Sequence, residues 1–334
     1  MPIVSSCPVC GGWECPLLLD GAEEALTAAG IGPSRAKPSH GRILRCRACG
    51  FAFRQFRPAG EDLARLYREA DSAVYEREAR NRTRTAERHA RMVRRRHAAP
   101  GAILDVGCAS GQFLKAMADA GWETWGVEPS AAEFRLAQET LGTRAVLRNS
   151  TLQDAGFSRR FTVITLWDVL EHVTEPVSFL EQCAALLAPG GRLLFTVPDM
   201  DSWQARAMRE RWPLLLAEHL NYFNPRSLRL CCRRAGLELT KTGRRPASFS
   251  VDYILFRLAQ HGWPAAAFLR KTARATGLAH LPLPVYLGEL VADCRPAAAA
   301  QSGADEDSPS RADALARHSP PQAATRRTNR VRSA

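Results

Sequence analysis

The chain has 334 residues, and its 46 basic and 34 acidic side chains give it a formal net charge of +12. This length suggests about two domains, and the shares of apolar (46%) and charged (24%) residues are those of a globular protein, which excludes wholesale disorder and collagen-like chains. No apolar run approaches the roughly 18 residues that cross a bilayer, and the first residues do not resemble a secretory signal. We therefore expect a cytoplasmic protein, in whose reducing environment clustered thiols more often bind metal than form disulfides.

Residues 1–58 carry two matching cysteine pairs. Cys7 and Cys10 open one Cys-x-x-Cys-Gly turn, and Cys46 and Cys49 open a second. The two-residue spacing places both sulfurs of a pair on one side of a tight turn, and the glycine that follows can adopt a positive φ. Four thiolates suit a structural Zn²⁺ ion with tetrahedral coordination, whereas a redox dithiol would leave the second pair unexplained. We predict a zinc ribbon-like module that depends on the metal for much of its folding free energy.

Residues 59–98 are expected to form a helical lead-in. Leu63, Leu66 and Tyr67 recur at helical spacing. The stretch 76–97 holds nine arginines against three glutamates. Such a run is more often the solvated face of a helix than a surface that attracts substrate or RNA, so the positive net charge assigns no partner by itself.

An apolar strand and a glycine loop come next. The strand begins at Ala102 and ends in an acid, Asp105, and the loop that follows contains Gly107, Cys108 and Gly111. Glycine at position 107 lets the backbone approach a ligand without a Cβ clash. Glycine at position 111 opens a helix whose free N–H groups favour a carboxylate. A dinucleotide-binding loop would show Gly-x-Gly-x-x-Gly directly after the strand, so this spacing disfavours NAD.

This run resembles motif I of the class I S-adenosylmethionine-dependent methyltransferases. The resemblance implies an α/β fold, a Rossmann-like sheet with helices on both faces. It implies that Asp105 accepts a hydrogen bond from the methionine ammonium group. We interpret Cys108 as a small filler beside the cofactor and not as a nucleophile. The central glycine that is usual in the family is Ala109 in this chain.

Further cofactor contacts are expected beyond this loop. Glu128 ends the next strand, 23 positions after Asp105, where the resemblance implies a carboxylate that accepts from both ribose hydroxyls. The run that begins at Asn149 lies where the family contacts adenine, partly through the backbone. We interpret Trp167 as a wall of the pocket. The other expected cofactor contacts are Pro129, Thr151 and Leu152.

Two later runs extend the resemblance. Residues 161–173 look like the fourth strand of the family and the loop under the methionine, and residues 187–198 match its Pro-Gly-Gly turn into a fifth strand. In all, residues 5–295 resemble zinc-module methyltransferases related to the ubiquinone-type O-methyltransferases. The resemblance implies S-adenosylmethionine as cofactor and methyl transfer to a small-molecule acceptor, with oxygen favoured over carbon as the accepting atom.

The candidate catalytic residues are Asp168, His172 and His219. Asp168, Glu171 and His172 have the spacing of one helical face, if that segment is helical. A hydroxyl acceptor must lose a proton, which a base or a metal can assist. Three interpretations stay open: local structural roles, a metal-free histidine base, and a second divalent metal like that of the metal-assisted members of the superfamily.

Two other functions also stay open. One is an RNA methyltransferase in which the zinc module and the arginine-rich helix hold phosphates, although the module is poor in the aromatic and lysine side chains that hold bases. The other is a non-catalytic interaction protein with the same fold, which the presence of Gly107, Gly111 and Glu128 disfavours. The sequence identifies neither the acceptor nor the oligomeric state.

These patterns divide the chain into four parts. We expect a zinc ribbon-like module (1–58), a helical lead-in (59–98), a methyltransferase domain (99–296) and a tail (297–334) whose Ala, Ser, Pro and Arg composition predicts disorder. We expect the zinc module to roof the acceptor pocket or to pack on the catalytic domain.

Overall fold

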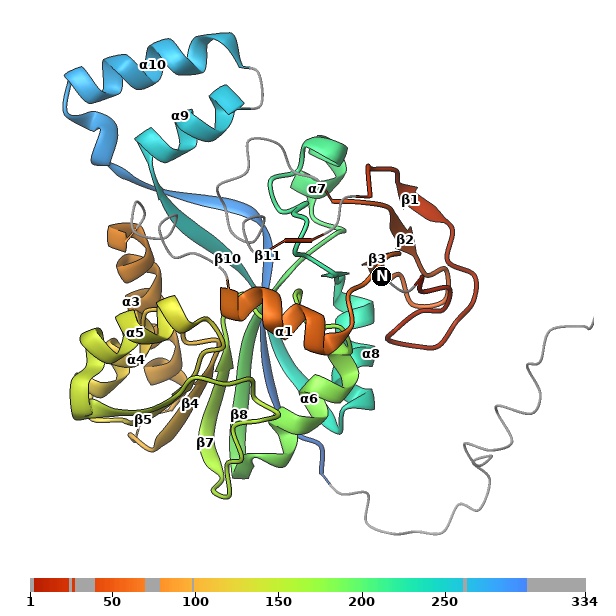
Figure 1. The fold of residues 1–334 in the computed structure, drawn as a ribbon, viewed down its shortest axis with the longest axis vertical. Helices are drawn as coiled ribbons and strands as arrows, with labels where there is room; N and C mark the ends of the chain where they lie inside the picture. Colours follow the sequence, from red (N-terminus) through yellow and green to blue (C-terminus); the bar gives the residue numbers. More distant parts are fainter. Residues whose placement is uncertain are drawn as a thin grey trace, which may run out of the picture. The chain divides into compact units, whose positions relative to one another are not determined.

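A seven-stranded sheet forms the centre of the fold in the computed structural model (Figure 1), with the order β10-β11-β8-β7-β4-β5-β6. The structure describes residues 3–23, 26–27, 40–69, 79–97, 99–260 and 263–298. Neighbours from β8 to β6 pair in parallel, whereas β11 and β10 are antiparallel. The strands are β4 (Ala102–Val106), β5 (Glu123–Val127), β6 (Ala145–Arg148), β7 (Phe161–Leu166), β8 (Leu187–Pro198), β10 (Leu237–Ser250) and β11 (Pro282–Pro296).

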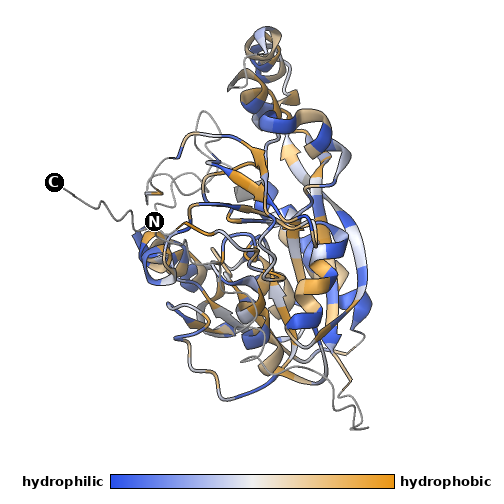
Figure 2. Ribbon diagram, turned by 90° about the vertical axis from the view of Figure 1, so that its right-hand side faces the viewer, coloured by the Kyte–Doolittle hydropathy of each residue, from blue (hydrophilic) through white to orange (hydrophobic). Residues whose placement is uncertain are grey.

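Helices cover both faces of this sheet, because successive strand residues point to opposite sides. Ile103 packs with α3 and α4, whereas Leu104 packs in the core cluster that includes α6 and α8. Figure 1 shows these two groups of helices on opposite sides of the sheet, and Figure 2 shows apolar residues along its strands. The predicted Rossmann-like α/β fold is therefore confirmed. The helices on these faces are α3 (Ala79–Arg96), α4 (Gln112–Ala118), α5 (Ala131–Leu141), α6 (Pro176–Ala185) and α8 (Pro225–Arg234).

A second, four-stranded sheet joins the cysteine pairs to the rest of the chain. Its order is β1-β2-β3-β9, and all of its neighbours are antiparallel. The strand β9 follows His219 in the sequence, and its Asn221 pairs with Phe53 of β3. The N-terminal region therefore shares a sheet with a segment more than 150 residues away. The strands are β1 (Leu17–Leu19), β2 (Ile43–Arg45), β3 (Ala52–Arg54) and β9 (Asn221–Tyr222).

The other helices lie outside these two groups. Two of them, α9 and α10, form a hairpin between β10 and β11 (Figure 1). Trp263 and Phe268 in this hairpin are largely exposed. Among the described ranges, every helix is too short or too polar to span a bilayer. The remaining helices are α1 (Gly60–Glu69), α7 (Trp203–Met208), α9 (Val251–Gln260), α10 (Pro264–Ala275), and the 3-10 turns η2 (Gly142–Arg144), η3 (Arg209–Arg211) and η4 (Leu278–His280).

The predicted lead-in contains two described helices, α1 and α3, and residues 70–78 between them lie outside the described residues. Met1–Ala297 form one compact unit of the chain. The tail predicted to be disordered lies outside the described residues, apart from its first two positions. The three boundaries between the four predicted parts stay predictions.

Candidate active site

A deep crevice lies beyond the carboxyl ends of the central strands, where ligands bind in open α/β sheets. A cavity of about 1010 Å³ there adjoins a smaller one of about 340 Å³. The residues that line both cavities are Arg82, Gly107, Ala109, Trp167, Asp168, Leu214 and Glu289. The loop after β4 and the loop after β7 therefore stand between the two cavities.

The glycine loop after β4 contains three residues with a positive φ. Gly107 and Gly111 have φ values of 75° and 77°, in the left-handed region that favours glycine. A Cβ atom on Gly107 would lie 2.8 Å from Val169 Cγ2. Ala109, which replaces the usual glycine, also has a positive φ, 46°. The loop therefore keeps its left-handed turn, although this conformation costs conformational energy for alanine that it would not cost for glycine.

Glu128 links this loop to the end of β5. Its carboxylate is buried, and it accepts hydrogen bonds from the N–H of Ala109 (2.9 Å) and the N–H of Ser130 (2.8 Å). Burial raises the pKa of Glu128 to about 7. Each carboxylate oxygen can accept more than one hydrogen bond, so Glu128 retains acceptor capacity toward the larger cavity that it lines.

Asp105 lines the smaller cavity and is the next-to-last residue of β4. It is 2% exposed and accepts a hydrogen bond of 2.6 Å from the Thr165 hydroxyl. Burial raises its pKa to about 8, so a positively charged group beside it would stabilise the ionised carboxylate.

The other expected cofactor contacts fall in two groups. Pro129, Thr151 and Leu152 line the larger cavity, and Cys108 lines the smaller one. Gly111 lines neither cavity and instead caps α4, where a Cβ atom would lie 2.7 Å from Leu141 Cδ1. Its role in the structure is therefore to let α4 begin and pack.

Trp167 forms the wall between the two cavities. Its ring stacks on that of His89, with centroids 3.9 Å apart, and its indole N–H has no hydrogen-bond partner among the described residues. Arg82 lies in the crevice and pairs with Glu133 at 3.6 Å. The interpretation of the arginine-rich stretch as a solvated face did not single out Arg82 or His89, because the sequence does not show which face of α3 turns inward.

The candidate catalytic residues come from two loops. Residues 167–174 form turns, so Asp168, Glu171 and His172 do not share a helical face. The fold nevertheless brings Glu171 and His172 next to His219, with the possible ligand atoms of these three residues all within 4.8 Å of one another. Asp168 is not part of this group.

Both histidines have one ring nitrogen directed at a backbone carbonyl. The Nδ1 atom of His172 lies 3.1 Å from the Glu218 carbonyl oxygen, and that of His219 lies 2.8 Å from the Leu214 carbonyl oxygen. Because a carbonyl can only accept, each Nδ1 carries the proton and each Nε2 keeps a lone pair. Burial lowers the pKa of His172 to about 4 and that of His219 well below its usual value. Both rings are therefore neutral at pH 7.

Asp168 is held in a strained backbone conformation. Its φ is 58°, and the buried Thr196 hydroxyl accepts from its N–H (2.8 Å) and donates to its Oδ1 (2.7 Å). The side chain of Asp168 is exposed to the crevice. The sequence did not single out Thr196, because it reads as one of several β-branched residues in a buried strand.

The four predicted zinc ligands lie together. The Sγ atoms of Cys7, Cys10, Cys46 and Cys49 are all within 4.8 Å of one another. The glycines that follow the two pairs have φ values of 76° and 77°, as the turns predict.

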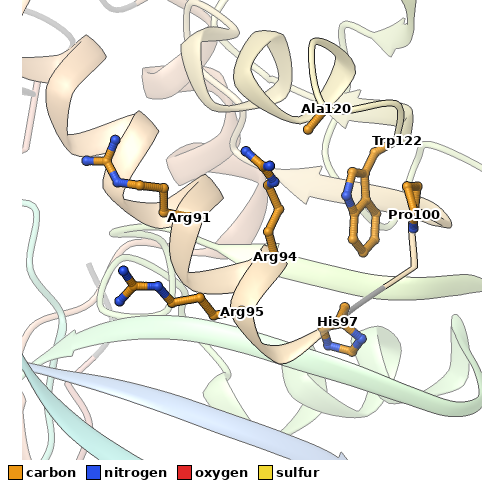
Figure 3. Close-up of a pocket in the computed structure, with 7 residues that line it drawn as sticks. All are labelled: Arg91, Arg94, Arg95, His97, Pro100, Ala120 and Trp122. Atoms are coloured by element: carbon orange, nitrogen blue, oxygen red, sulfur yellow. The ribbon is translucent and has the colours of Figure 1, made fainter.

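A separate basic pocket of about 470 Å³ lies at the carboxyl end of α3. Figure 3 shows Arg94 reaching toward Ala120 and Trp122, whereas the side chains of Arg91 and Arg95 point away from Trp122. No carboxylate is present among the described residues that line this pocket. It therefore lacks the chemistry of the crevice, and its arginines do not converge on one point.

Comparisons with known proteins show what the chain is similar to. A family model described as a methyltransferase domain matches residues 75–242, half of the chain. A ubiquinone biosynthesis O-methyltransferase from Actinobacillus pleuropneumoniae serotype 7 is 36% identical over 103 residues, which are 28% of this chain and 44% of that protein. The protein of the same name from Azoarcus sp. strain BH72 is 29% identical over 149 residues, which are 41% of this chain and 64% of that protein. The chain thus spans less than two thirds of the length of these relatives.

Among solved structures, a chain in the complex between the Haloferax volcanii Trm112 methyltransferase activator and a methyltransferase has the same fold. The TM-score is 0.50 at 17% identity, and the match covers 73% of this chain and all of that chain.

Proposed function

The chain belongs to the class I S-adenosylmethionine-dependent methyltransferases, and we propose that it transfers a methyl group from this cofactor to a hydroxyl group of a small molecule. The observation that carries the proposal is the bridge between Glu128 and the Ala109 N–H, which joins the glycine loop to the strand end in one crevice. The ubiquinone biosynthesis O-methyltransferases that it resembles support oxygen as the accepting atom.

The residues of the crevice fit the proposed cofactor. Glu128 has spare acceptor capacity for the ribose hydroxyls, and Thr151 and Leu152 line the part of the larger cavity that would hold adenine. Burial raises the pKa of the Asp105 carboxyl group, and the methionine ammonium group would stabilise its ionised form. Trp167 offers a buried indole N–H and a flat wall beside the methionine end.

The bound cofactor supplies an electrophilic methyl group on sulfur, which an acceptor oxygen attacks in line. The contribution of the chain to that step is to hold donor and acceptor at near-attack distance and to exclude water, effects that can lower a barrier by several kcal/mol. The larger cavity has room for both molecules, since about 1010 Å³ exceeds the volume of most single-ligand pockets.

We further propose that Glu171, His172 and His219 hold a divalent metal ion that assists loss of the acceptor proton. Two neutral imidazoles with free Nε2 lone pairs, each oriented by a carbonyl, and a nearby carboxylate are the donor set of a metal site. A histidine with a pKa near 4 is a weak base for a hydroxyl group, which favours the metal over a metal-free histidine base. A metal ion held there would lower the pKa of the acceptor hydroxyl group that binds to it.

The cysteine cluster is proposed to bind one structural Zn²⁺ ion. Four sulfur atoms within 4.8 Å of one another leave no open coordination position for catalysis. We propose that residues 1–58 pack on the catalytic part through the shared sheet and so help to shape the acceptor pocket. Deletion of residues 1–58 without harm to folding or acceptor specificity would reject this role. Reduced thiols at this site suit the cytoplasm.

Calorimetry on the purified full chain tests the central proposal. We expect S-adenosylmethionine and its demethylated product, S-adenosylhomocysteine, to bind with one site per chain, and metal analysis of the same sample to show one zinc ion. Binding of neither nucleoside would refute the enzymatic function and favour the interaction protein.

A further inference from the structure

Arg57, from the N-terminal region, is buried against both loops that carry the candidate catalytic residues. Its side chain is 1% exposed. Its Nη2 atom donates to the backbone carbonyls of Val173 (3.1 Å) and Thr174. The same guanidinium donates to the Asn221 side-chain oxygen (2.9 Å) and, more weakly, to the Leu220 carbonyl (3.4 Å).

Asn221 extends this connection. Its side-chain amide donates to the carbonyls of Leu170 (2.9 Å) and Val173 (2.7 Å). The backbone N–H groups of Leu220 and Asn221 both donate to the Glu171 carbonyl, at 2.8 and 3.0 Å. The segment with Glu171 and His172 is therefore tied to the segment with His219 by Arg57, Asn221 and the backbone between them.

The choice of arginine at this position is informative. The pKa of Arg57 falls only to about 10 on burial, so the group stays charged at neutral pH, and its hydrogen-bond partners in the described residues are carbonyl and amide oxygens. A buried charge is costly, and an apolar residue of similar volume would fill the space at less expense. A guanidinium, however, presents several donors in a rigid planar fork, which fixes the spacing of the oxygens that it binds.

We propose that Arg57 is a positioning residue that sets the separation between His172 and His219 without contacting either ring. The effect of Arg57 on methyl transfer rests on the proposed function. Its effect on the distance between the two histidines does not depend on that function. The cysteine region would in this way control the geometry of the reaction centre.

The test uses the full chain with ¹⁵N-labelled histidine and with no metal ion at the site of Glu171, His172 and His219. In the parent protein, long-range ¹H–¹⁵N spectra should show His172 and His219 as single neutral Nδ1–H tautomers. Arg57→Met should broaden or split both signals and weaken Co²⁺ binding at this site by about 10–100-fold, as loss of an outer-shell contact does. Arg57→Lys should restore part of both properties. Affinity for S-adenosylhomocysteine should stay within about twofold, since Arg57 does not line the crevice.

Arg192→Lys is the matched control, because Arg192 bonds to Asp293 on neighbouring strands of the central sheet and touches neither loop. It should lower stability without changing the two histidine signals. Unchanged histidine spectra in folded Arg57→Met would overturn the inference. If that variant does not fold, unchanged histidine spectra and unchanged Co²⁺ affinity in Arg57→Lys would overturn it. A parent protein that binds neither Co²⁺ nor S-adenosylhomocysteine would refute the proposed function, while the spectra would still decide the role of Arg57.

Discussion

The hydroxyl of Thr196 locks Asp168 by two hydrogen bonds, one to its backbone N–H at 2.8 Å and one to its Oδ1 at 2.7 Å. Thr196 is fully buried in β8, whereas Asp168 has a φ of 58° at the edge of the crevice. A rigid strand thus maintains a left-handed residue at the point where the two cavities meet.

Thr196→Val should lower the free energy of unfolding by about 1–3 kcal/mol, because it removes both hydrogen bonds from a buried site while it keeps the side-chain shape. Asp168→Gly should cost less stability in this background than in the parent chain, because the side-chain hydrogen bond that it removes is already lost there. In both backgrounds glycine adopts the positive φ without strain. Urea unfolding of both single variants and the double variant measures the coupling. Additive effects would show that Thr196 does not constrain Asp168.

Glu128→Ala should weaken binding of S-adenosylmethionine by about 1–3 kcal/mol in calorimetry, because it removes the charged acceptor between the glycine loop and β5. Glu123→Ala is the matched control, since Glu123 begins the same strand but pairs with Arg159 at the surface. Equal affinity of the two variants would contradict the role of Glu128.

The carboxyl group of Asp105 should lower the stability of the ligand-free chain as the pH rises. Asp105 has its pKa raised by burial to about 8, so the folded state binds more protons than the unfolded state above the ordinary carboxyl pKa. Its contribution to the stability is therefore fully present below pH 4 and lost as the pH approaches 8. Asp105→Asn should flatten this dependence in denaturant unfolding at pH 5 and pH 8, and saturating S-adenosylmethionine should oppose the loss. A steeper fall for Asp105→Asn would disprove the assignment.

Cys49→Ser should abolish stoichiometric zinc and lower the melting temperature, because a structural tetrathiolate site contributes its binding free energy to folding. Cys15→Ser should retain the metal, since Cys15 lies outside the four-cysteine group; its Sγ donates to the Gly12 carbonyl and lies beside the Cys46 thiol. Metal analysis and thermal unfolding of both variants provide the comparison. One zinc per chain in Cys49→Ser would rule out the proposed ligand set.

The double variant Arg94→Gln, Arg95→Gln should leave S-adenosylhomocysteine affinity within about twofold of the parent value, because these side chains lie at the basic pocket away from the crevice. We expect no steep loss of RNA affinity with rising salt. A plot of the logarithm of RNA affinity against the logarithm of salt concentration would support the RNA methyltransferase if its slope corresponded to several phosphate contacts and became shallower in the double variant.

The parts of the fold and site that the sequence predicts are those encoded in short, continuous patterns. The strand that contains Asp105 is buried along its whole length, and the strand before Glu128 is buried over its last two residues, so each acid follows a short buried apolar run. The cysteine pairs are equally local, and the fold brings them together as expected.

The remaining features depend on tertiary contacts that leave no local signal. His172 and His219 meet across 46 intervening positions, through turns and not along one helix. The strand β9 has only two residues, too few for any periodic pattern. From the sequence, Arg57 would be assigned to the surface of a basic chain, whereas its hydrogen bonds to backbone carbonyls and to the Asn221 side chain explain its burial.

The pairing of β3 with β9 has a practical consequence for dissecting the chain. A truncated protein that starts at residue 59 would retain β9 but lack β3. The backbone of Asn221 and Tyr222 would then have no strand to pair with on that edge. The first 58 residues and the segment after His219 should therefore be kept together whenever the enzyme is shortened, fused or grafted.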